Sequence, residues 1–133
     1  MPLSGEVFVK FSGDTLIKYE SLKEWRTHDG IDIKAAVGTD VVAVAEGKVT
    51  RVYEDPLWGT TVEITHPNSV VSVYCGLSKE VSVKEGDSLK IKDVIGKVGQ
   101  TNMAELSLDP HLHFGMKKDG KWVDPLAEMD MVK

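Results

Sequence analysis

The histidines are the residues of this chain whose type and spacing indicate chemistry. The sequence contains 4 His, and two of them, His111 and His113, flank Leu112 in a segment that predicts a strand. Because side chains alternate between the two faces of a strand, both imidazoles should point one way while Leu112 and Phe114 point the other. Two imidazoles on one face indicate a metal site or an acid–base pair; the alternative is a pair of partly exposed histidines without a role in chemistry.

A second polar group lies at His28–Asp32, with the sequence HDGID. Gly30 permits a turn, and the isoleucines of the strand that follows should face the core, which leaves Asp32 on the other face beside His28. An Asp buried there needs a partner. Taken alone, this group indicates a turn with a solvated His. Joined by one His of the H-x-H pair, it makes an N, N, O ligand set with a fourth position open to water, as in catalytic zinc sites.

Short segments with strand character would position these residues. They are rich in Val, Ile, Thr and Tyr and are separated by Gly or Asp turns, as in sandwiches and barrels. The expected strands are 6–11, 31–33, 41–45, 48–53, 61–65, 70–74, 81–84, 89–94, 111–116 and 121–123. Helical periodicity is confined to 20–25 and 125–131, the second with Pro125 at its start. We expect one all-β domain over 1–133, an antiparallel β-sandwich or barrel-sandwich with few short helices.

Two segments of the chain, 38–49 and 86–98, resemble each other. Each starts at a Gly, continues through apolar residues and ends in Gly-Lys-Val. The spacing between the two glycines is 9 residues in the first segment and 10 in the second, so one copy needs a bulge or a longer turn. The pair predicts two related hairpins that pack into one sandwich, against the alternative of chance similarity between Gly- and Val-rich segments.

Composition excludes several classes of protein. Of 133 residues, 16 are Lys or Arg and 21 are Asp or Glu, and the net charge of −5 argues against a general binder of nucleic acid or anionic membranes. The single Cys excludes an internal disulfide framework. No apolar run approaches the roughly 20 residues of a membrane helix, and residues 1–5 lack the features of a signal peptide. A targeting segment, if the protein works outside the cytoplasm, is missing from this chain.

A series of motifs between about residues 3 and 126 carries a family resemblance. In order they are H-D-G-I-D-I, G-T-x-V-x-A-x-A-x-G-x-V, V-x-E-G-D, I-G-x-V-G, H-L-H-F and V-D-P. The chain resembles the lysostaphin-type (LytM) zinc endopeptidases of bacterial cell walls. Within that family it is most similar to the domain of stage II sporulation protein Q and its clostridial relatives, on the segments 25–28 and 55–59 and the stretch before H-x-H.

The resemblance implies a set of site residues. The metal ligands of the family, which hold one zinc ion, fall on His28, Asp32 and His113, and its catalytic acid–base His falls on His111. A further catalytic His belongs to a Y-x-H motif, and here that position is Gly76. The resemblance therefore predicts a chain that keeps its zinc and hydrolyses poorly or not at all.

Two further residues near the motifs bear on activity. Cys75 should not replace the missing imidazole, because on a strand it points away from Gly76, and a small buried core residue is the better interpretation of it. Gly115 stands where the H-x-H-F motif is usually followed by Glu.

The resemblance also implies a setting and partners. We expect a degenerate, zinc-binding domain that acts in protein interaction during sporulation, with a stage III sporulation membrane protein as partner. The alternative is an active endopeptidase that cleaves peptidoglycan peptides with His111 and zinc. A carrier domain of the lipoyl type fits less well, because no modifiable Lys occupies a hairpin tip. The family implies an extracytoplasmic location and an N-terminal membrane helix that is absent from this chain.

Other polar and aromatic residues have plainer interpretations. His66, at a strand end, is expected to form structural hydrogen bonds. Trp25 and Trp58 either line a substrate or partner groove or pack in the core and loops. Asp14, Asp55, Asp87 and Asp109 are expected to form turns.

Overall fold

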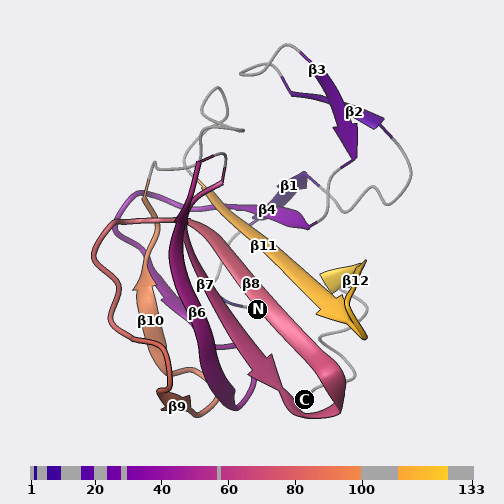
Figure 1. The fold of residues 1–133 in the computed structure, drawn as a ribbon. Coiled ribbons are helices and arrows are strands. Elements are labelled where there is room, and N and C mark those ends of the chain that lie inside the picture. The colour runs from indigo at the N-terminus through magenta and orange to yellow at the C-terminus, as the bar shows by residue number, and fades with distance from the viewer. Residues whose placement is uncertain are drawn as a thin grey trace.

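The computed structural model describes residues 2, 6–9, 16–19, 24–27, 30–56, 58–99 and 111–125. The first three of its strands, β1 (Glu6–Val9), β2 (Leu16–Tyr19) and β3 (Glu24–Thr27), are described by their backbone alone. Chain direction and strand labels can be followed in Figure 1.

The remaining elements are strands and one 3-10 turn. The strands are β4 (Ile31–Lys34), β5 (Asp40–Val42), β6 (Gly47–Asp55), β7 (Gly59–His66), β8 (Val70–Leu77), β9 (Ser88–Leu89), β10 (Val94–Lys97), β11 (His111–Lys118) and β12 (Lys121–Val123). The turn at Pro67–Ser69 joins β7 to β8.

One large antiparallel sheet organises the fold. Its order is β1-β4-β11-β8-β7-β6-β9, and β12 pairs with the end of β11. Strands β6, β7, β8 and β11 run side by side through its centre (Figure 1). A two-stranded sheet of β5 and β10 lies against it, and β2 pairs with β3. The prediction of an all-β antiparallel fold is confirmed.

The core fills the space between the large sheet and the β5–β10 pair. Alternate residues of the central strands point into it, which is the period-2 pattern of a half-buried strand. The largest fully buried side chains are Tyr74, Phe114, Ile31, Ile33, Ile64, Leu77, Ile95, Leu112, Met116, Val41 and Val49. The other face of β4, β7, β8 and β11 carries both polar and apolar side chains, among them Asp32, Val73 and Cys75, and the site described below lies on it.

Several expected elements differ from those observed. Residues 24 and 25 lie in β3, so the helix expected over 20–25 is wrong for these two residues. Residues 20–23 lie outside the described residues. Residues 81–84 form no strand, although Val81 and Val83 pack against the core. The strand expected over 89–94 is divided by a turn between β9 and β10. Pro125 is helical, and 126–131 lie outside the described residues.

The two similar segments pair with each other. Gly38 N donates to Val98 O and Gly86 N donates to Val49 O, each at 2.8 Å, so the start of each copy bonds the end of the other. Both glycines have positive φ, 93° and 95°. The longer copy has its register shift between Val94 and Gly96, as the extra residue predicts. Internal pairing thus supports the interpretation as related hairpins.

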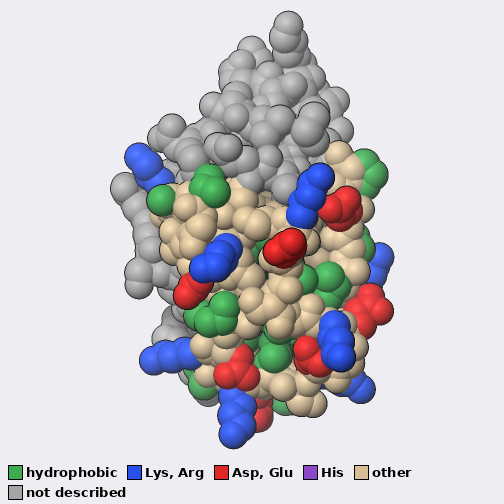
Figure 2. All heavy atoms as spheres, turned by 90° about the vertical axis from the view of Figure 1, so that its left-hand side faces the viewer, with side chains coloured by type: hydrophobic (Ala, Val, Ile, Leu, Met, Phe, Trp, Pro, Cys, Tyr) green, Lys and Arg blue, Asp and Glu red, His purple; other side chains and the backbone are tan. Residues whose placement is uncertain are grey.

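Surface charge on the described residues is mixed. Figure 2 shows Lys and Arg side chains interspersed with Asp and Glu over the face that carries the left-hand strands of Figure 1. Within the described ranges, no helix has the length and apolar character needed to cross a bilayer.

Candidate metal site and adjoining cavity

The site is built where β4 and β11 pair. His113 stands opposite Asp32, and His111 stands opposite Lys34, in the antiparallel register. Ile31, Ile33, Leu112 and Phe114 point into the core and are fully buried, so their neighbours in sequence share the opposite face. Alternation thus brings Asp32 and both histidines together from segments about eighty residues apart, as the sequence predicts.

Asp32 is at the centre of this group. Its Oδ1 lies 2.8 Å from His113 Nδ1 and 3.7 Å from His111 Nε2. Asp32 is 0% exposed, and the two histidines are 7% and 4% exposed at 111 and 113. A carboxylate withdrawn so far from water requires hydrogen bonds and a cationic partner, whether an imidazolium or a metal ion.

The residues present fit a zinc ion. Carboxylate oxygen and imidazole nitrogen are both zinc donors, and Asp32 Oδ1 and His113 Nδ1 face each other from one side of the sheet. The third expected ligand, His28, lies outside the described residues. Within those residues, no group of three His, Cys, Asp or Glu side chains forms a complete ligand set. The described part thus contains two of the three expected ligands, in contact with each other.

A cavity of about 220 Å³ adjoins His113 on the same face of the sheet. The row of paired residues across the sheet runs from Asp32 through His113, Cys75 and Thr61 to Tyr53. The last four of these line the cavity together with Asp55, Trp58, Val73 and Trp122. The aromatic lining was only partly predicted: Trp58 was a candidate, whereas Tyr53 and Trp122 were missed.

Trp58 is held against His113 by the hairpin loop between β6 and β7. Its ring stacks on the imidazole with a centroid separation of 4.2 Å and an interplanar angle of 21°. Asp55 Oδ1 accepts a hydrogen bond from Trp58 N at 3.0 Å, and Gly59 has a φ of 81°. Asp55 is therefore the expected turn former, and Trp58 lines the cavity. The side chain of Trp25 lies outside the described residues.

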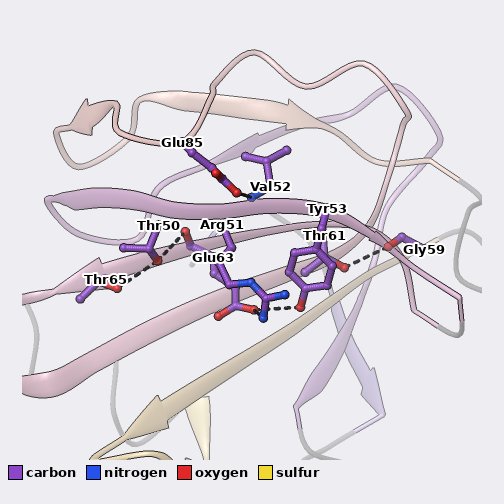
Figure 3. Close-up of polar contacts among 9 residues, drawn as sticks. All are labelled: Thr50, Arg51, Val52, Tyr53, Gly59, Thr61, Glu63, Thr65 and Glu85. Atoms are coloured by element: carbon purple, nitrogen blue, oxygen red, sulfur yellow. Dashed lines mark hydrogen bonds and ion pairs between the residues drawn. The ribbon is translucent and has the colours of Figure 1, made fainter.

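A buried acidic residue lies beside the cavity, next to Tyr53. Glu63 is 8% exposed; its Oε2 accepts a hydrogen bond from the Tyr53 hydroxyl at 2.8 Å and lies 3.5 Å from Arg51 Nη1 (Figure 3). Burial and the Glu63 carboxylate raise the pKa of Tyr53 well above its usual value. The tyrosine thus stays protonated and orders this wall of the cavity. Its period-2 spacing from Arg51 places the two side chains on one face of β6, but that Glu63 lies opposite Arg51 is known only from the structure.

Gly76 occupies a bulge at the end of β8. Cys75 pairs with Thr61 and Leu77 pairs with Thr60, so Gly76 is the extra residue of β8 at this point. Its φ of 80° lies in the left-handed region that favours glycine. The position of the missing Y-x-H histidine therefore carries no imidazole, and its backbone conformation is one that favours glycine.

Cys75 is buried as expected but does not belong to the core between the sheets. It is 5% exposed and faces the cavity beside His113, on the other side of β8 from Tyr74. The expected orientation away from Tyr74 is confirmed, and the interpretation as a core residue is corrected, because the face it occupies is that of the site.

His66 lies in a different part of the fold and has the structural role predicted for it. Its Nδ1 lies 2.7 Å from the Glu46 carbonyl oxygen, and its Nε2 lies 2.7 Å from Ser72 Oγ. Ser72 Oγ is in turn 2.8 Å from the Tyr74 hydroxyl, which accepts a hydrogen bond from Val44 N. This buried network ties the β7–β8 end of the large sheet to the segment after β5.

Comparison with known sequences identifies the family to which this arrangement corresponds. The sequence model of peptidase family M23 matches residues 26–125. Stage II sporulation protein Q of Bacillus subtilis (strain 168) is 42% identical over 103 residues, which are 76% of this chain and 36% of that protein. DD-carboxypeptidase/endopeptidase Mpg of Neisseria meningitidis serogroup B (strain ATCC BAA-335 / MC58) is 39% identical over 106 residues, 80% of this chain and 24% of that protein. The chain thus spans well under half the length of these relatives.

Comparison with solved structures indicates the same family of folds. A chain in the crystal structure of the SpoIIIAH and SpoIIQ complex superposes with a TM-score of 0.84 at 32% sequence identity. The match covers 96% of this chain and 97% of that one. The lysostaphin-type fold expected from the motifs is confirmed.

Proposed function

The chain belongs to peptidase family M23, and from that membership we propose that it is a zinc-binding, LytM-type domain with little or no hydrolytic activity that acts in protein interaction during sporulation. The contact between Asp32 Oδ1 and His113 Nδ1 supports the zinc site, and Gly76 supports the loss of activity. His28 completes the ligand set in this proposal.

The proposal divides the work between ligands and proton carriers. Asp32 and His113 would hold the ion on the β4–β11 face, where zinc would supply the Lewis-acid chemistry that activates water and polarises a carbonyl near neutral pH. His111, 3.7 Å from the same carboxylate, is the one remaining proton carrier of the pair that the family uses. Loss of one positioned acid–base group costs about 10²–10⁴ in rate.

Gly76 is the observation on which the loss of activity rests. Glycine offers no proton donor or acceptor in its side chain, and its φ of 80° disfavours any replacement by an L-residue. Cys75, its neighbour, faces the cavity, but a thiol at 5% exposure is a poor substitute for an imidazole titrating near neutral pH.

The interaction role follows from the sporulation relative and the solved complex. We infer that the partner is a sporulation membrane protein of the SpoIIIAH kind, met outside the cytoplasm, and that the intact protein is anchored by a membrane helix. In this proposal the ligand is either a peptidoglycan peptide or the membrane partner. Nucleic acid is not expected as a ligand.

The decisive experiment measures zinc content and cleavage on one preparation. Metal analysis of the purified chain should give close to one zinc per chain, with Asp32→Ala and His28→Ala losing it. The same zinc-loaded protein should release no fragments from peptidoglycan peptides or pentaglycine while an active family member does. Cleavage at a rate comparable to that enzyme would overturn the proposed loss of activity.

A second experiment tests the partner. A purified SpoIIIAH-type ectodomain should bind this chain in calorimetry or surface plasmon resonance, and an unrelated acidic domain of similar size serves as control. Absence of binding, with both proteins folded, would remove the interaction role.

The alternative function is an active endopeptidase that depends on His111. The burial of His111 beside Asp32 favours it, because that imidazole is placed to exchange protons at the metal site. Any cleavage by the wild type should then fall by about 10²–10⁴ in His111→Ala. Cleavage unchanged by this substitution would exclude the alternative.

A further inference from the structure

The His113 imidazole is enclosed by three different elements. Asp32 Oδ1 of β4 lies 2.8 Å from its Nδ1, and the Trp58 ring of the β6–β7 loop is stacked on its face. Gly30 borders its other edge, because a Cβ at that position would lie 3.1 Å from Nε2 and would collide with the Phe114 carbonyl oxygen. The chain leaves room there for the imidazole alone.

These contacts restrict different motions of the ring. The χ2 torsion of a histidine is broad and roughly two-fold, so tertiary contacts must set both the plane of the ring and the edge it presents. Stacking with an interplanar angle of 21° sets the plane. The contact with the Asp32 carboxylate then selects the orientation in which Nδ1 faces the carboxylate.

Trp58 is itself held in place before any ligand arrives. Its backbone N–H donates to Asp55 Oδ1, Asp55 pairs with Gly59 at the hairpin end, and the side chain is half-buried. The backbone that carries the indole is therefore held by contacts that do not involve His113.

We propose that Trp58 is a positioning residue for His113, fixing the plane of the imidazole so that Nδ1 is directed at the position it shares with Asp32. Its consequence for zinc rests on the proposed function. Groups that orient a metal-binding His typically change metal affinity by about 10- to 100-fold when removed. The competing interpretation is that Trp58 only fills the cavity.

The chain offers variants that separate these interpretations. Trp58→Leu keeps apolar volume but removes the flat ring, whereas Trp58→Phe keeps a ring that can stack. Trp122→Leu is the matched control, because Trp122 lines the same cavity while Lys117 Nζ lies over its ring, 4.6 Å from the centroid.

The first measurement uses the metal-free protein. In histidine-labelled protein at one fixed pH, nuclear magnetic resonance reports the ring protons and both ring nitrogens of each His. His113→Gln assigns the signals. Wild type, Trp58→Phe and Trp122→Leu should show His113 ring protons shifted upfield by stacking and a single tautomer. Trp58→Leu should lose the upfield shift and move the two nitrogen shifts toward an average.

The second measurement is the zinc dissociation constant from chelator competition. It should rise about 10-fold in Trp58→Leu and stay within about three-fold of wild type in Trp58→Phe and Trp122→Leu. Equal affinity or equal His113 signals in Trp58→Leu and wild type would overturn the positioning role. If the wild type binds no zinc, the proposed zinc function fails, and the His113 signals alone decide the role of Trp58.

Discussion

At the scale of single residues, burial favours the neutral form of His66 within its hydrogen-bond network. Burial lowers its pKa below the ordinary 6.5, outweighing the Glu46 carbonyl, whose hydrogen bond raises it. Below pH 6.5 His66 therefore binds a proton more readily in the unfolded chain than in the folded chain. This contribution to stability is present above the unfolded pKa and is lost as the pH falls through the folded value. We expect the urea-derived free energy of unfolding to decrease from about pH 7 to about pH 5.

The other histidines also titrate in this range, so the comparison must be with His66→Gln. At neutral pH this variant should lose about 1–3 kcal/mol, since it disturbs buried partners at Ser72 and Glu46. Its stability should then depend less steeply on pH than that of the wild type. Tyr74 stays protonated throughout, because burial raises its pKa to about 12. Equal slopes for the two proteins would contradict the assignment to His66.

Gly76 gives a second prediction at this scale. Because its φ is 80°, Gly76→Ala should destabilise the protein by about 1–2 kcal/mol in urea denaturation. Gly76→Asn should cost less, since Asn adopts the left-handed region more readily than Ala does. A wild-type midpoint for the alanine variant would show that the bulge accepts an L-residue, and would weaken the argument that a histidine is excluded there.

The polar residues of the site show what a sequence can reveal at this scale. Alternation predicted the face of its own strand that Asp32 or His113 occupies, because the period of a strand is fixed by its backbone, and the pairing of β4 with β11 makes the two faces one. The stacking of Trp58 and the Tyr53–Glu63 hydrogen bond were not foreseeable. They depend on the register between β6 and β7 and on the hairpin loop, which local sequence does not specify.

At the scale of elements, the two paired hairpins of the internal repeat should respond alike to the same substitution. Gly38 and Gly86 begin the two copies with φ of 93° and 95°, and an added Cβ would meet nothing within 4 Å at either position. At both positions, therefore, only the positive φ disfavours a side chain. Gly38→Ala and Gly86→Ala should each lower the free energy of unfolding by about 1–2 kcal/mol, and by similar amounts.

Asparagine variants at the same two positions provide the control, and both should be milder than alanine. If only one of the two alanine variants has a lower free energy of unfolding, the two similar turns do not contribute equally to stability. Urea denaturation of the four variants beside the wild type is sufficient to decide.

Strand prediction succeeded or failed element by element for identifiable reasons. The strand expected at 121–123 coincides with β12, and those at 48–53, 61–65 and 70–74 lie inside β6, β7 and β8. The alternating segment 81–84 has strand-like composition but forms no ladder, because burial of Val81 and Val83 produces the same pattern without strand pairing. In residues 24–25, sheet pairing with β2 overrides a weak helical periodicity.

At the scale of the whole molecule, family motifs carried more than periodicity did. Strand-like segments and alternation indicated an all-β domain and the faces of Asp32 and His113, and the motifs added the lysostaphin-type fold and the expected ligand set. The third ligand, His28, lies outside the described residues, so convergence of all three ligands stays a prediction.

Zinc binding should be visible as a change in global stability. A ligand that binds only the folded state adds about 2.7 kcal/mol at a concentration one hundred times its dissociation constant, which for a chain of this size is roughly 10 °C in Tm. Calorimetry with and without zinc should show this increase for the wild type and not for Asp32→Asn, which keeps the shape of the side chain but loses its charge. Asp40→Asn is the control, because Asp40 is an exposed carboxylate, 56% accessible, whose partner is Lys97. An undiminished zinc response in Asp32→Asn would place the ion elsewhere, since no ligand set that depends on the charge of Asp32 could survive that change.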